Sequence, residues 1–288
     1  MALPRRLQRQ AGRYALVDGI NFCLPVNAEH SPALMAVFPI SADKARALLP
    51  GNEIHPLRLG KKGLLIIAVI DYRSTVIGKY IEFSIGIACT HGARPAPLLL
   101  PALFRGRYGT GQFVYDLPVS TEVSVKGGKG IWGMPKHQAS LDFVIGHETV
   151  SSQYDLDGQL AMKVEIQRPR RVWLPLATRA VNYSQFRGLL MKSYIYFSGK
   201  MGFSLWKKGS GRLTIGDHPR LQALKYLEIG ADPLATAFFP ETRGALDDHF
   251  EGWFLSSVAP PKQMPEGLES VVDLGLGQAW PEPPRRTG

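Results

Sequence analysis

The stretch GLLIIAVIDYRSTVIGKYIEFSIGIACTHG, residues 63–92, contains two long apolar runs separated by a short segment with Gly78. Both runs, 63–75 and 80–92, are rich in β-branched and other apolar residues, which favour strands packed in a sheet. A connection of only a few residues between two such runs is typical of antiparallel neighbours. The stretch therefore predicts a pair of long antiparallel strands.

A second strand pair is predicted downstream, at residues 149–167. Asp157-Gly158 separates two alternating runs there, and Asp-Gly in that position is a strong signal for a hairpin. The apolar segment 141–146 leads into this hairpin. The stretch 184–215 contains several glycines, each of which would destabilise a helix by up to ~1 kcal/mol. We therefore expect strands and turns in 184–215 rather than a long helix.

Few helices are expected in this chain. Residues 41–51 predict a short helix that Ser41 begins and Pro50-Gly51 ends, and residues 220–228 predict another. The fold class predicted by these signals is α+β, mainly antiparallel β, with the strands closed into a barrel and a few flanking helices.

A chain of 288 residues could hold one large domain or two ordinary ones, and the strand signals taken together favour one domain across residues 1–288. We expect a basic N-terminal tail at about 1–13 and a tail rich in proline and glycine at about 260–288. Neither tail is expected to contribute to the barrel.

Composition and charge exclude several classes of protein. The formal net charge of +10 comes from basic residues that are scattered or lie near the ends, with no helix-turn-helix and no aromatic RNA-binding pattern. Cys23 and Cys89 show no metal-ligand spacing, so neither a disulfide framework nor a metal site is expected. The N-terminus lacks the apolar run of a signal peptide or membrane span. We therefore expect a soluble cytoplasmic protein that binds neither nucleic acid nor membrane.

The stretch GIWGMPKHQAS, residues 130–140, combines residue types that a surface loop does not need, with Lys136 between a proline and a histidine. Glu82 is also unusual, because it interrupts an apolar strand. Both have ordinary interpretations: most lysines are solvated, and strand alternation alone favours a Glu82 that points outward. The alternative is a lysine and a carboxylate inside the barrel.

The order and spacing of these segments resemble the acetoacetate decarboxylase family. The likeness rests on a strand with Y-x-E, a turn of the G-x-P-K type, the hairpin segment DFVIGHETVSSQYDLDGQLAMKVEI and the later segment SGRLTIGDHPRLQAL. It covers roughly residues 35–256, and the ordered set is more specific than any one motif.

The resemblance implies a catalytic lysine at Lys136 that forms a Schiff base with a β-keto acid, and a Glu82 that lines the same pocket. A protonated imine accepts the electron pair that remains when CO₂ leaves the neighbouring carbon. Such a carbon-carbon lyase requires no cofactor and no metal, since the lysine amine supplies the electron sink. Lys136 must then be available as a neutral amine.

The sequence departs from the family pattern at several positions. The family has a second lysine directly after the first, where this chain has His137, whose charge depends on pH near neutrality. We expect His137 to act as a catalytic residue that tunes Lys136 or transfers a proton. The family's Gly-Arg-Glu run corresponds here to residues 128–130, Gly-Lys-Gly, and residues 64–70 carry no acidic side chain.

Three residues are candidates for holding the substrate. Trp132 and Met134 are predicted to line the approach to Lys136, although both residue types are equally typical of an ordinary core. Arg107 is the candidate for the substrate carboxylate, with Arg73 and Arg105 as alternatives chosen by residue type only.

Three functions remain open from the sequence. The first is decarboxylation of a small β-keto acid of the acetoacetate type. The second is aldolase or dehydratase chemistry on an oxo acid through the same imine, with Glu82 or His137 as proton shuttle. The third is non-catalytic binding of a small ligand. We also expect a homo-oligomer, as is common in the family, in which the apolar segment 94–104 invites association.

Overall fold

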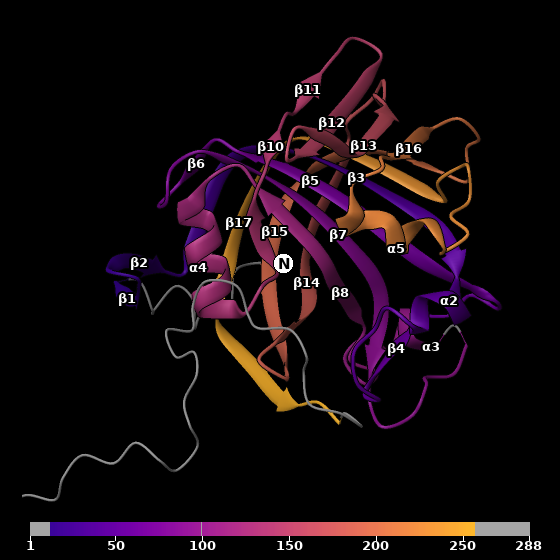
Figure 1. Cartoon of the computed structure of the whole chain (residues 1–288). Coiled ribbons are helices and arrows are strands. Elements are labelled where there is room, and N and C mark those ends of the chain that lie inside the picture. The colour runs from indigo at the N-terminus through magenta and orange to yellow at the C-terminus, as the bar shows by residue number, and fades with distance from the viewer. Residues whose placement is uncertain (1–11, 99, 257–288) are drawn as a thin grey trace, which may run out of the picture.

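The computed structural model describes residues 12–98 and 100–256 of the chain. Strands dominate this part of the chain, and seven of them close into a barrel (Figure 1). In order of hydrogen bonding the seven are β7 (Tyr80–His91), β5 (Lys62–Tyr72), β3 (Val26–Ser41), β17 (Ala235–Phe254), β15 (Leu189–Leu205), β14 (Leu174–Phe186) and β8 (Gly111–Val119). β8 pairs with β7 and so closes the ring. The predicted fold class is confirmed.

A second antiparallel sheet and several short elements surround the barrel. The second sheet consists of β10 (Ser140–Leu141), β11 (Val144–Ile145), β12 (Thr149–Leu156), β13 (Gln159–Gln167) and β16 (Gly211–Ile215). The remaining strands are β1 (Arg13–Val17), β2 (Ile20–Leu24), β4 (Ile54–Pro56), β6 (Ser74–Thr75) and β9 (Lys136–Gln138). The helices are α2 (Ala42–Arg46), α3 (Leu100–Leu103), α4 (Glu122–Trp132), α5 (Gln222–Lys225) and the short 3₁₀ helix η1 (Pro219–Leu221). None of the described helices is long and apolar enough to cross a membrane.

The strand pair predicted at residues 63–92 forms as expected, because β5 and β7 are antiparallel neighbours in the barrel. The predicted hairpin forms between β12 and β13, and both of its turn residues, Asp157 and Gly158, adopt positive φ angles of 53° and 76°. This is the conformation for which Asp-Gly is favoured in two-residue turns. Strands also occupy most of residues 184–215, as predicted.

The predicted helices are present but short. Ser41 caps α2 by accepting a hydrogen bond from the backbone of Lys44, and α2 ends before the predicted Pro50-Gly51. The segment predicted as a helix at 220–228 is divided between η1 and α5. Apart from residues 12 and 13, the two predicted tails lie outside the described residues.

The barrel wall has an outer face and an inner face. On β5, Leu65 and Ile67 are fully buried in one apolar cluster with Tyr154 of the second sheet, which lies outside the ring of strands in Figure 1. On β14, Val181 belongs to the same cluster, while Arg179, two residues earlier on the same face, is exposed to solvent. Since side chains alternate along a strand, the residue between Leu65 and Ile67 on β5 and the residue between Arg179 and Val181 on β14 point to the barrel interior.

Candidate active site

Lys136 begins the three-residue strand β9, where it pairs with Leu117 of β8 in parallel register. Parallel neighbours need a crossover connection, and α4 supplies it between β8 and β9. The predicted G-x-P-K turn therefore follows directly from the end of this helix. The side chain of Lys136 is buried, at 8% exposure, which is rare for a lysine without a partner.

The partner of Lys136 is Glu82 on β7. The Nζ atom of Lys136 lies 2.7 Å from Oε2 of Glu82, whose side chain is 11% exposed. Nζ also donates a hydrogen bond of 2.9 Å to Oγ of Ser124 on α4. Glu82 therefore faces the lysine on the inner side of the wall, against the outward orientation that alternation alone favours. Three elements, β7, α4 and β9, converge on one amine.

Helix α4 contacts the lysine through a glycine. A Cβ added to Gly128 would lie 2.3 Å from Cδ and 2.7 Å from Cε of Lys136. The aliphatic part of the lysine side chain therefore occupies the space that a side chain at position 128 would need. On other sides of α4, Gly127 contacts Phe22 and Gly130 contacts Val17 of the β1–β2 hairpin just as closely. Sequence reasoning overlooked this role, although the run of three glycines in a helical segment was a signal for close packing.

Two tyrosines line the same inner site. Tyr72 and Tyr80 are cross-strand neighbours whose rings stack with centroids 4.5 Å apart, and the Tyr80 centroid lies 5.4 Å from Nζ of Lys136. Burial raises the pKa of both phenols well above the usual value, and the negative charge of Glu82 raises it further. Both hydroxyls therefore stay protonated near neutrality. Tyr80 belongs to the Y-x-E motif, whereas nothing in the sequence singled out Tyr72.

His137 follows Lys136 on β9 and consequently points to the outer face. Its Nε2 atom lies 2.8 Å from the Tyr154 hydroxyl, which donates a hydrogen bond of 3.2 Å to Asp116. Arg220 binds the same carboxylate through Nε at 2.9 Å. Burial, with help from the charge of Arg220, lowers the pKa of His137 to about 3. The structure thus does not bring His137 to the lysine amine, and the ring is neutral at physiological pH.

The other predicted site residues are placed as follows. Trp132 and Met134 are buried in an apolar cluster with Leu117, the strand partner of Lys136, and their place at the approach to the lysine stays a prediction. The indole of Trp132 donates a hydrogen bond to the backbone oxygen of Asp247. Arg107 is exposed and precedes β8, while Lys136 pairs near the other end of that strand. The structure does not bring Arg107 to Lys136.

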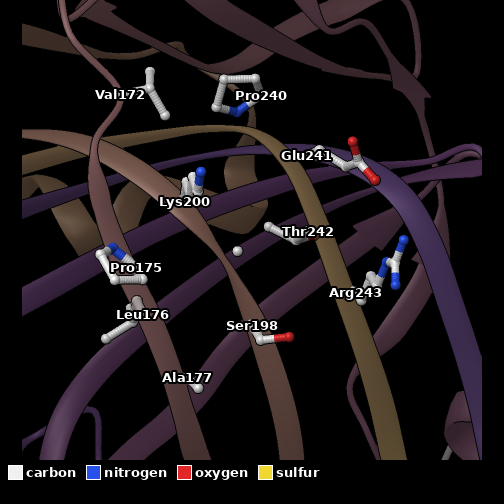
Figure 2. Close-up of a pocket in the computed structure, with 11 residues that line it drawn as sticks. Val172, Pro175, Leu176, Ala177, Ser198, Lys200, Pro240, Glu241, Thr242 and Arg243 are labelled. Atoms are coloured by element: carbon white, nitrogen blue, oxygen red, sulfur yellow. The ribbon is translucent and has the colours of Figure 1, made fainter.

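A surface groove of about 660 Å³ lies on β14, β15 and β17, as Figure 2 shows. Lys200, Arg243 and Glu241 are among its lining residues, together with Pro175 and Ala177. It shares no lining residue with the cluster around Lys136.

Comparisons with known proteins agree with this architecture. The family profile described as acetoacetate decarboxylase (ADC) matches residues 15–242. The comparison with curated protein sequences gives no significant match.

Solved structures with the same fold include an acetoacetate decarboxylase from Legionella pneumophila subsp. pneumophila str. Philadelphia 1, with a TM-score of 0.55 at 14% identity over 77% of this chain and 85% of the other. The enduracididine biosynthesis enzyme MppR has a TM-score of 0.54 at 14% identity over 79% and 88% of the two chains. An acetoacetate decarboxylase-like enzyme from Sphingomonas wittichii RW1 has 0.54 at 13% identity over 81% and 94%. At these identities the matches show the fold and not the reaction.

The close contact of Gly128 with Lys136 predicts that Gly128→Ala displaces the lysine without unfolding the protein. Alanine is favoured over glycine within a helix, so propensity alone would stabilise the variant slightly. We expect the rate of borohydride-trapped adduct formation with acetoacetate to fall at least tenfold, while thermal unfolding changes little. Gly106→Ala is the matched control, because a Cβ there meets nothing within 4 Å. An unchanged trapping rate in Gly128→Ala would contradict the contact.

The buried neutral His137 predicts a contribution to acid unfolding. Its pKa is about 3 in the folded protein and near 6.5 in the unfolded chain, so the unfolded state binds more protons between these values. The stabilising contribution of the neutral ring is present above about pH 6.5 and is lost as pH falls toward 3. Burial raises the pKa of Asp116, which makes the unfolding free energy change with pH in the opposite direction. This contribution is common to the original protein and to a variant at position 137.

We therefore expect His137→Gln to lose about 2 kcal/mol less unfolding free energy than the original protein between pH 7 and pH 4. Urea unfolding followed by circular dichroism at several pH values measures the difference. Parallel stability curves for the two proteins would show that His137 is solvated or protonated in the folded state.

Proposed function

The chain belongs to the acetoacetate decarboxylase family, and from that premise we propose that Lys136 forms a Schiff base with a 3-oxo acid and that the protein releases CO₂ from it. The observation that carries the proposal is the buried contact of 2.7 Å between Nζ of Lys136 and Glu82. A buried lysine in contact with one carboxylate has both a nucleophile and a proton acceptor within hydrogen-bond distance.

In the first step Glu82 accepts a proton from the Lys136 ammonium, which leaves a neutral pair in place of an ion pair. The neutral amine attacks the carbonyl carbon of the substrate. Protonated Glu82 then returns a proton to the carbinolamine oxygen, water leaves, and an iminium forms.

In the second step the bond between the carboxylate carbon and the α-carbon breaks. Its electron pair forms the enamine double bond, and the iminium nitrogen becomes neutral while CO₂ departs. The step removes one positive and one negative charge, so a site of low polarity favours it. Among the described residues that contact Lys136, no arginine or lysine would hold the substrate carboxylate in its charged form. Glu82 would repel that carboxylate.

The enamine must then be protonated at the α-carbon and the imine hydrolysed. Tyr72 and Tyr80 keep their protons near neutrality, and both interact with Glu82. The phenols and Glu82 together form a relay that passes a proton taken up from the solvent to the carbon, so that each member of the relay is left in its starting protonation state. Water then adds to the iminium, and the ketone and the free lysine amine are released.

An aldolase or dehydratase reaction through the same imine is the second candidate. Glu82 favours it too, since a carboxylate next to the imine suits proton removal from an α-carbon. MppR, which has the same fold, has been observed with the condensation product of pyruvate and imidazole 4-carboxaldehyde. Release of CO₂ distinguishes decarboxylation from this alternative.

The proposed imine predicts a covalent adduct on Lys136. Reduction with borohydride in the presence of acetoacetate, or of pyruvate for the aldolase alternative, should add the corresponding mass to one peptide. Lys136→Met should abolish the adduct, whereas Lys208→Met, at an exposed lysine, should leave it unchanged. Modification of other lysines with none on Lys136 would overturn the proposal.

The role of Glu82 predicts a catalytic defect in Glu82→Gln. Glutamine keeps the shape of the side chain but accepts no proton from the ammonium, so we expect the turnover number to fall more than tenfold, about 1.4 kcal/mol in the barrier. CO₂ release from a panel of 3-oxo acids measures the effect. Glu122→Gln changes an exposed carboxylate on α4 and is the matched control. Equal turnover of both variants would remove Glu82 from the mechanism.

A further inference from the structure

Two rows of inner residues lead away from the lysine across four neighbouring strands, β7, β5, β3 and β17. The pairing register aligns the first row as Glu82, Ile70, Ala33 and Phe239. It aligns the second row, displaced by two residues along each strand, as Ser84, Ala68, Met35 and Ala237. Directly paired residues point to the same face of a sheet. All eight therefore share the inner face with Glu82.

These rows form one continuous wall, which we call the inner wall and which comprises the eight residues just named. Neighbouring strands lie about 4.8 Å apart, so Phe239 is about 14 Å from Glu82 when measured along the curved sheet. The ring of Phe239 meets that of Phe197 on β15 in an edge-to-face contact with centroids 6.2 Å apart. The inner wall thus begins at the reactive amine and ends at an aromatic pair.

Three of the eight residues of the inner wall have small side chains. Ala33, Ala68 and Ala237 occupy positions where a closed barrel otherwise carries large side chains. Met35 and Ile70 remain partly exposed to solvent, whereas Leu34, Ala36 and Val69 on the outer face are buried. Solvent therefore reaches apolar side chains on the inner side of the barrel, beside the lysine site.

The inner wall contains no side chain that could form an ion pair with an anionic group at the far end of a substrate. Glu82 is the single ionisable residue in the two rows, and the other seven are apolar apart from Ser84. Further apolar side chains, Leu176, Phe197, Met201 and Phe203, pack against Ala33, Ala237 and Phe239. A charged group placed there would lose its hydration without a counter-ion, which is strongly unfavourable.

We propose that the inner wall binds an extended, uncharged apolar substituent of the carbonyl substrate, such as an aliphatic chain or an aryl ring. The substrate class is then a 3-oxo acid with a substituent longer than the methyl group of acetoacetate and without a second anionic group at its far end. This inference rests on the proposed imine at Lys136, which fixes the reacting carbonyl at one end of the inner wall.

The test uses the full-length protein and compares 3-oxo acids whose substituents differ in length. Acetoacetate, 3-oxohexanoate, 3-oxooctanoate and benzoylacetate are each titrated against the protein, and the Lys136 adduct is trapped with borohydride and quantified by mass spectrometry. 3-Oxoadipate serves as the charged counterpart of 3-oxohexanoate. Since burial of each methylene is favourable, we expect half-saturation of 3-oxooctanoate at a concentration at least tenfold below that of acetoacetate. We expect 3-oxoadipate to bind at least tenfold more weakly than 3-oxohexanoate.

Two variants test the location of the substituent. Ala33→Leu fills the inner wall and should raise the half-saturation concentration of 3-oxooctanoate at least tenfold, while acetoacetate stays within about twofold. Ala177→Leu makes the same change at an exposed position on β14 and should affect neither compound. Ala68→Val is the milder alternative if Ala33→Leu does not fold, and retained trapping of acetoacetate shows that a variant is folded.

Each outcome has a distinct meaning. Equal half-saturation across the series, or tight binding of 3-oxoadipate, would overturn the proposed substrate class while leaving the imine intact. Equal responses of 3-oxooctanoate and acetoacetate to Ala33→Leu would also overturn it. An absence of any Lys136 adduct with every compound would instead contradict the proposed function itself.

Discussion

The buried pair of Lys136 and Glu82 is the interaction on which the rest of the site depends. Both groups lose most of their hydration on folding, and each is retained only because the other lies 2.7 Å away. The pair joins β9 to β7 across β8, and Ser124 ties it to α4. The glycine at position 128 is required by the same arrangement, since any side chain there would occupy the place of the lysine stem. Removal of either partner would leave an uncompensated buried charge, so the pair is unlike the exposed ion pairs elsewhere on the surface.

Side chains alternate between the two faces of β9, so the consecutive residues Lys136 and His137 lie in different surroundings. Lys136 faces the interior, whereas His137 faces the outer cluster of Tyr154, Asp116 and Arg220. A histidine that is neutral and turned away cannot repel the ammonium form of the lysine. In the proposed mechanism, activation of the amine therefore relies on proton transfer to Glu82 rather than on a neighbouring cation. The outer cluster joins β9, β8, β12 and the segment of η1, so its effect on the lysine is through the position of β9.

Sequence reasoning predicted the barrel and, as one alternative, a lysine and a carboxylate inside it, but it did not predict the residues around that pair. The alternating apolar runs of β5 and β7 predicted their pairing because side-chain periodicity is a local property. The orientation of Glu82 was not decided locally, since both faces of β7 are buried, one by the second sheet and one by the barrel interior. Tyr72 and Ser124 were missed because their proximity to Glu82 depends on strand register and on the crossover through α4. Arg107 was chosen by residue type, which carries no information about distance.

Exchange of a carbonyl oxygen is the most direct test of the proposed imine on Lys136. Imine formation expels the ketone oxygen as water, and hydrolysis restores an oxygen taken from the solvent. The protein incubated with 2-butanone in H₂¹⁸O should therefore incorporate ¹⁸O into the ketone well above the background rate, as measured by mass spectrometry, with no requirement for a carboxylate or a leaving group. Lys136→Met should reduce the exchange to background. Exchange at the same rate in both proteins, or none above background in either, would contradict an imine at Lys136.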